Sequence, residues 1–123
     1  MNEKKKILDL NGKKVTMTLP QATARMGIRR SLMIYAAFDA KVAAEKAGTP
    51  LDEETYVISY RTLPDLVIGS KDVDGIKFPP TAEELLDMPE SFVNAWLGAI
   101  YEVNPHWNPK NSTKQDDEKK AES

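Results

Sequence analysis

The segment from Phe78 to Pro109 constrains the fold most, because it contains a helix start, an amphipathic stripe and a helix stop. Thr81 and Glu84 have the spacing of a capping box, in which each side chain accepts a backbone N–H at the helix start. Apolar residues then recur at Phe92, Val93, Trp96, Leu97, Ile100 and Val103. This helical spacing predicts one buried stripe. Asn104 precedes a proline and is disfavoured in the α conformation, so the helix should end there.

The N-terminal region has the pattern of a β-hairpin. Asn11-Gly12, a pair that the type I′ turn favours, separates the strand-like segments Lys6–Leu10 and Lys13–Leu19. Apolar and polar residues alternate in the second segment, as they do in a half-buried strand. An isolated hairpin is marginally stable in water, so this one should lie on a helix of the chain or on another subunit.

Pro20–Ala47 is predicted to be mainly helical, because alanine, the strongest helix former, is abundant in it. Gly27 is expected to divide it into a short turn, Gln21–Met26, and a long helix, Ile28–Ala47, which Gly48 ends. The predicted apolar stripe of the long helix consists of Ile28, Leu32, Tyr35, Ala36, Val42, Ala43 and Ala47.

A further helix is predicted from Asp52 to Val67, with a kink or a break at Pro64. The segment Gly69–Pro80 reads as a loop that includes a short edge strand at Ile76–Phe78. The expected fold is therefore mainly α (α+β), with four to five helices and an N-terminal β-hairpin. The stripe Phe92–Val103 is expected to pack on Tyr56–Val67 and Leu32–Val42.

The single helical domain is expected to span residues 1–107. Residues 108–123 contain one apolar residue, Ala121, and this composition predicts a disordered polar tail. The apolar segments are short and interrupted by charges, so no membrane span or secretory signal is expected.

The composition offers little for catalysis. The chain has no cysteine and one histidine, His106, and its six glycines are scattered, so no metal site, phosphate loop or acid–base pair is expected. We therefore expect no enzyme, no cofactor and no metal. The net charge of −2 gives no reason to expect nucleic-acid binding.

The candidate partner-binding residues are Arg25, Arg29, Arg30, Phe78 and Trp107. The three arginines form either a solvated face with carboxylate partners or a docking patch for an acidic partner. Trp107 follows the helix stop, and its indole either folds back onto the domain as a lid or serves as an exposed interface anchor.

Four segments resemble the C-terminal part of tail assembly chaperones from long-tailed bacteriophages and prophages: Phe78–Thr81, Leu85–Glu90, Asn94–Trp96 and Tyr101–Trp107. The resemblance implies a small, mainly helical protein without catalytic residues that binds the tape measure protein. It would keep that client soluble in the bacterial cytoplasm until the major tail protein polymerises around it. It would be absent from the mature virion.

The resemblance leaves three client surfaces open: the hairpin Ile7–Leu19, the helix Ile28–Ala47 and the loop Gly69–Pro80. Many genes of this family also make a longer product by ribosomal frameshifting, and Glu118-Lys119-Lys120 is compatible with such a site. The plain alternative for this segment is a frayed terminus. Two alternatives remain at this point. One is a structural component of a phage tail or neck, and the other is a small adaptor that uses its arginines on nucleic acid. A homo-oligomer is compatible with each.

Overall fold

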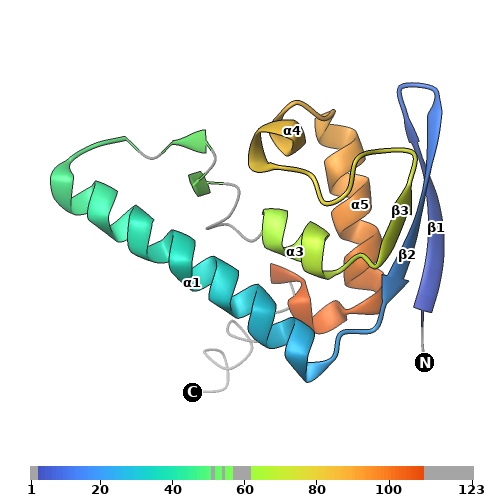
Figure 1. Ribbon diagram of the computed structural model, residues 1–123, viewed down its shortest axis with the longest axis horizontal. Coiled ribbons are helices and arrows are strands. Elements are labelled where there is room, and N and C mark those ends of the chain that lie inside the picture. The colour runs from blue at the N-terminus through green and yellow to red at the C-terminus, as the bar shows by residue number, and fades with distance from the viewer. Residues whose placement is uncertain (1–2, 51, 54, 57–61, 110–123) are drawn as a thin grey trace, which may run out of the picture.

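The computed structural model describes residues 3–50, 52–53, 55–56 and 62–109, and in this part it forms an α+β fold with four α-helices and a three-stranded antiparallel sheet (Figure 1). The predicted fold class, mainly helical with an N-terminal hairpin, is confirmed. The elements are β1 (Glu3–Leu10), β2 (Lys13–Pro20), α1 (Ala24–Ala47), α3 (Thr62–Ile68), β3 (Asp72–Asp74), α4 (Ala82–Leu86), α5 (Glu90–Val103) and the 3-10 helix η1 (Pro105–Trp107).

The sheet grows from the predicted hairpin. Asn11 and Gly12 adopt φ values of 52° and 88°, as a type I′ turn requires. β3 pairs antiparallel with the other edge of β2, with Val73 opposite Met17. The prediction of an edge strand at Ile76–Phe78 is wrong, because Gly75, at a φ of 109°, turns the chain out of the sheet after Asp74.

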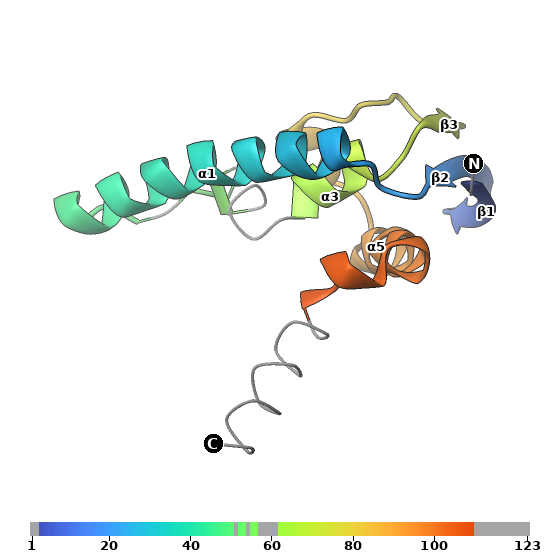
Figure 2. The same ribbon diagram turned by 90° about the horizontal axis from the view of Figure 1, so that it is seen from below.

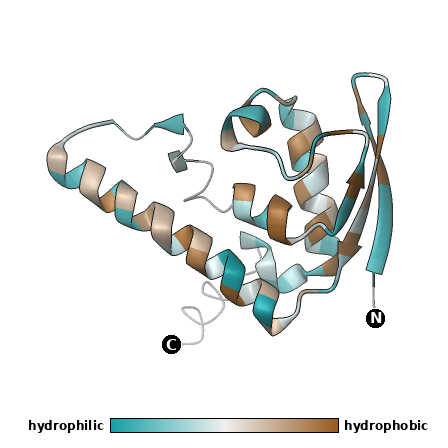
Figure 3. Ribbon diagram, viewed as in Figure 1, coloured by the Kyte–Doolittle hydropathy of each residue, from teal (hydrophilic) through white to brown (hydrophobic). Residues whose placement is uncertain are grey.

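The hydrophobic core lies between the sheet, α5 and α3 (Figures 1 and 3). The alternation in β2 turns three fully buried side chains, Val15, Met17 and Leu19, to this side. The predicted stripe of α5 is confirmed as part of the core, with Phe92, Trp96 and Ile100 buried. Its predicted packing on Leu32–Val42 is wrong, because α1 contacts α3 while the sheet covers α5.

Trp96 is the centre of the core. Its side chain is fully buried, and its indole Nε1 donates to the hydroxyl of Ser70 at 2.9 Å. The ring of Phe92 meets the indole edge-on at 5.8 Å between centroids. Gly69 is required beside this site, because an added Cβ would lie 2.5 Å from the carbonyl oxygen of Asp65.

The helix ends follow the local sequence. Thr81 and Glu84 form the predicted capping box, whose bonds lower the pKa of the Glu84 carboxyl, chiefly through the Thr81 backbone N–H. The helix that they cap ends at Leu86, and α5 begins after Pro89. α5 ends at Val103, and Asn104 leaves the helical conformation as predicted.

The predicted break at Gly27 is wrong. α1 is continuous from Ala24 to Ala47, because a capping box at Thr23 starts the helix before the glycine is reached. Its predicted end is confirmed, since Gly48 adopts the left-handed conformation with a φ of 70°.

The second predicted helix is described only in part. Residues 53, 55 and 56 are helical, residues 57–61 lie outside the described residues, and α3 begins at Thr62. Pro64 lies in the first turn of α3. Backbone N–H groups in the first turn form no hydrogen bond within the helix, so a proline there removes none. The predicted polar tail lies outside the described residues from position 110 onward. Within the described helices, none is long and apolar enough to span a membrane.

Candidate functional site

Asn104 connects the end of α5 to the last residue of β2 and to the segment that leads from β2 to α1. Its side chain is fully buried, its Oδ1 accepts the backbone N–H of Ala22 at 2.7 Å, and its Nδ2 donates to the carbonyl oxygen of Pro20 at 3.2 Å. Asn104 therefore has a structural role, because its side chain ties the end of α5 to the chain that leads into α1.

We expect Asn104→Ala to lower the free energy of unfolding by about 1–3 kcal/mol, because it leaves a partly buried N–H and carbonyl without partners. Denaturant unfolding measures the change. Asn94→Ala, at an exposed position of α5, is the control and should change stability by less than about 0.5 kcal/mol. Equal effects would contradict the role of Asn104.

A buried ionic cluster holds α1 against the rest of the domain. The Nε of Arg30 donates to the carboxylate of Asp65, and the hydroxyl of Tyr101 donates to the other carboxylate oxygen at 2.5 Å. The guanidinium of Arg30 also lies over the ring of Trp107, 4.8 Å from its centroid. The cluster thereby joins α1 to α3, α5 and η1.

The structure separates the predicted partner-binding residues. Arg25 and Arg29 are exposed on α1, whereas the side chain of Arg30 is 12% exposed and belongs to the ionic cluster. Trp107 is 4% exposed, so the first alternative, an indole folded back onto the domain, is the observed one. Phe78 is half-buried, with its ring 6.3 Å from that of Trp96, and thus lies in another part of the domain.

One side of α1 leaves large apolar side chains in solvent. Ile28, Leu32, Tyr35 and Phe38 are 62%, 63%, 66% and 50% exposed, and we call these four residues the α1 face. The apolar stripe predicted for this helix is thus exposed at Ile28, Leu32 and Tyr35, and the packing expected of Leu32–Val42 on α5 does not bury Leu32 or Tyr35. The helix turns its opposite side toward α3, and its only buried residue is Ala37. The C-terminal half of α1 projects away from the sheet and α5 (Figures 1 and 2).

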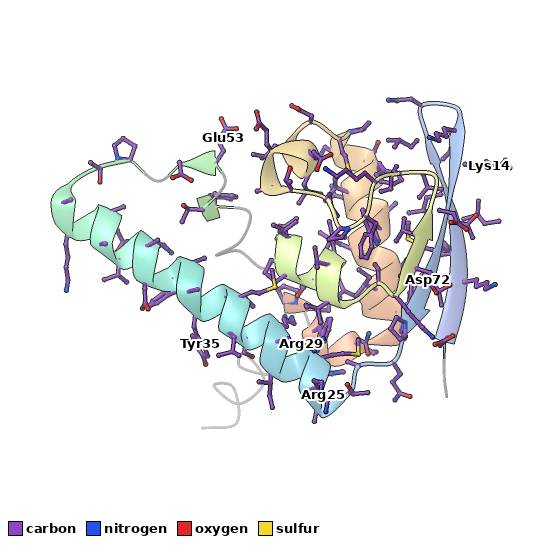
Figure 4. The ribbon with its side chains drawn as sticks, in the orientation of Figure 1. Lys14, Arg25, Arg29, Tyr35, Glu53 and Asp72 are labelled. Carbon is purple, nitrogen blue, oxygen red and sulfur yellow. The ribbon has the colours of Figure 1, made fainter. Side chains whose placement is uncertain are left out.

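A groove of about 510 Å³ runs beside the α1 face, between α1 and η1. The residues that line it are Ala24, Gly27, Ile28, Arg30, Ser31, Leu32, Tyr35, His106 and Trp107. Gly27 faces open space, because a Cβ built on it would meet nothing within 4 Å. The α1 face and this groove, which we call the α1–η1 groove, share Ile28, Leu32 and Tyr35 and form one mainly apolar surface. Tyr35 and Arg25 lie along the side of α1 that points away from α3 (Figure 4).

The other two predicted client surfaces offer less. On the hairpin, the large exposed apolar residue is Ile7, at 59%, while the inward residues of β2 belong to the core. In the loop, Gly69, Ser70 and Pro80 are buried against the domain. Of the seven large apolar side chains exposed in the described part of the chain, four form the α1 face.

The described residues contain no group of three or more His, Cys, Asp or Glu side chains that could hold a metal ion. Comparison with protein-family models, with curated proteins and with solved structures gives no match. The function of the chain is therefore inferred from its own residues, above all from the α1 face.

Proposed function

We propose that this protein is a phage tail assembly chaperone that binds the tape measure protein and keeps it soluble during tail morphogenesis. The observation that carries the proposal is the α1 face, an apolar surface on a helix whose other side already packs on the domain. The sequence resemblance after Phe78 supports the same conclusion.

The geometry of the α1 face suits a helical client. From Ile28 to Phe38 it spans about 15 Å along α1, about three helical turns. An amphipathic helix can lie along such a surface and place its own apolar residues in the α1–η1 groove, as in other helix-in-groove complexes. A long helical client presents many such segments, so many chaperone copies could coat it.

The proposed chaperone acts only during assembly of the tail. It works without catalysis in the cytoplasm of the bacterial host, and it leaves the tape measure protein when the major tail protein assembles. The polar segment 108–123 then serves as a linker in a longer, frameshifted product that carries a second domain.

Co-expression with the tape measure protein tests the proposal. The chaperone should raise the soluble fraction of the client and co-purify with it, and Leu32→Glu should abolish both effects by placing a charge in the apolar contact. Ile7→Glu makes the same kind of change at a similarly exposed residue of the hairpin and should preserve them. An insoluble client with the unaltered protein, or equal loss in both variants, would contradict the proposal.

A structural role in a phage tail or neck is the second candidate. The observation that favours it is β1, whose outer edge is unpaired among the described residues and could extend the sheet of a neighbouring subunit. Lys4, Lys5 and Lys6 lie on this strand, however, and lysines on an edge strand oppose such pairing. Mass spectrometry of purified virions distinguishes the two, because a structural component remains in the particle.

A further inference from the structure

The α1 face has a basic border. Arg25 precedes Ile28 by three residues and Arg29 precedes Leu32 by three, so on a helix each arginine lies next to an apolar residue of the face. Both arginines are exposed, and neither forms an ion pair with any residue that the structure describes. The surface therefore combines an apolar centre with two available guanidinium groups.

The position of Arg25 in the first turn of α1 increases its attraction for anions. The first turn of α1 contains no acidic residue, and the N-terminal end of a helix carries a partial positive charge. The neighbouring Arg30 shows the contrast, because the carboxylate of Asp65 neutralises it inside the domain. Arg25 and Arg29 have no such carboxylate within the described part of the fold.

We propose that the α1 face binds an amphipathic helix of another protein, in which Asp or Glu residues border the apolar stripe and pair with Arg25 and Arg29. The inference rests on the proposed chaperone function and defines which segments of a helical client are bound. Apolar burial in the α1–η1 groove supplies the affinity, while the carboxylates fix the orientation and register of the bound helix.

Two other occupants fit the surface less well. The segment 110–123 contains a single apolar residue, Ala121, and cannot cover four large apolar side chains. A second copy could pair its own α1 face with this one. The only acidic residues of α1 are Asp39 and Glu45, in its C-terminal half, so an antiparallel copy would offer Arg25 and Arg29 one nearby acid, Asp39.

Two synthetic peptide helices test the proposal. They share one apolar stripe and differ in its border, which is Glu in one and Lys in the other. Fluorescence anisotropy with the full chain measures both affinities at low and high salt. We expect the Glu-bordered peptide to bind at least about tenfold more tightly at low salt, and this preference to shrink as salt screens the exposed charges.

Charge reversal on the protein provides the matched comparison. Arg25→Glu/Arg29→Glu should invert the preference between the two peptides. Lys13→Glu/Lys14→Glu changes the net charge equally, at the hairpin turn on the far side of the molecule from Arg25 (Figure 4), and should leave the preference unchanged. All four positions are exposed, and circular dichroism confirms that each variant is folded.

The outcomes separate this inference from the proposed function. Equal binding of both peptides, or an equal response of the two double variants, would overturn the acidic border while leaving an apolar client site in place. Binding of neither peptide would overturn the inference, and a dimer in sedimentation analysis that Leu32→Glu dissociates would assign the surface to a second copy. Failure of the proposed function appears separately, in the co-expression with the tape measure protein.

Discussion

Asp65→Ala is expected to lower the free energy of unfolding by about 3–5 kcal/mol, because it leaves the guanidinium of Arg30 buried without a counter-charge. Asp65 is fully buried and accepts from both Arg30 and Tyr101, so the substitution also removes two hydrogen bonds. Urea or thermal unfolding measures the loss.

A double variant distinguishes two causes of this loss: the missing attraction between Arg30 and Asp65, and the buried charge of Arg30 that is left without a partner. Arg30→Met/Asp65→Leu removes both charges and retains apolar volume, so it should be clearly more stable than Asp65→Ala alone. If Asp65→Ala costs about 1 kcal/mol or less, the ionic cluster does not hold α1 to the domain.

Trp96→Ala should cost about 3–5 kcal/mol of unfolding free energy, because it opens a cavity at the centre of the core. The indole is fully buried and packs against the rings of Phe92 and Phe78. Its removal therefore leaves a space that is enclosed by other core side chains. The midpoint of denaturant unfolding reports the change directly.

Two milder variants test the same site. Ser70→Ala leaves the indole N–H without its acceptor and should cost about 1–3 kcal/mol. Leu97 follows Trp96 in α5 and is half-buried rather than fully buried. Leu97→Ala should therefore cost less than Trp96→Ala. Unchanged stability of Trp96→Ala would mean that the stripe of α5 is a surface rather than a core.

Features governed by neighbouring residues were predictable from the sequence. The Asn11-Gly12 turn, the Thr81–Glu84 capping box and the end of α5 at Asn104 depend on local backbone conformation and short hydrogen bonds. The stripe of α5 was predictable because its apolar residues recur with the period of an α-helix and so lie on one side of it. These elements define most of the core.

Features governed by distant residues were not predictable. Asn104 binds Ala22 and Pro20, and Asp65 binds Arg30, across separations that no local pattern encodes. The third strand forms where the chain pairs with the free edge of β2. The residues that pair there are Asp72–Asp74, which precede Gly75, whereas the predicted strand followed it.

At the candidate site, too, contacts between distant residues decided what the sequence could not predict. Helical spacing predicted that Ile28, Leu32 and Tyr35 share a side of α1, and they do. Spacing does not say whether that side meets the domain or solvent, and the contact between α1 and α3 leaves it in solvent. A basic border of Arg25 and Arg29 beside an apolar stripe was the available signal of a surface.

The most direct test of the central claim, that the α1 face is the client site, is the reactivity of single cysteines toward a maleimide. The chain has no cysteine of its own, so Tyr35→Cys and Lys14→Cys each introduce one reporter at an exposed position. In the complex with the tape measure protein, we expect Tyr35→Cys to react at least about tenfold more slowly than in the free chain, because docking excludes the reagent. Lys14→Cys should react at the same rate in both. Protection at the hairpin position, with Tyr35→Cys unprotected, would contradict the assignment of the client site to α1.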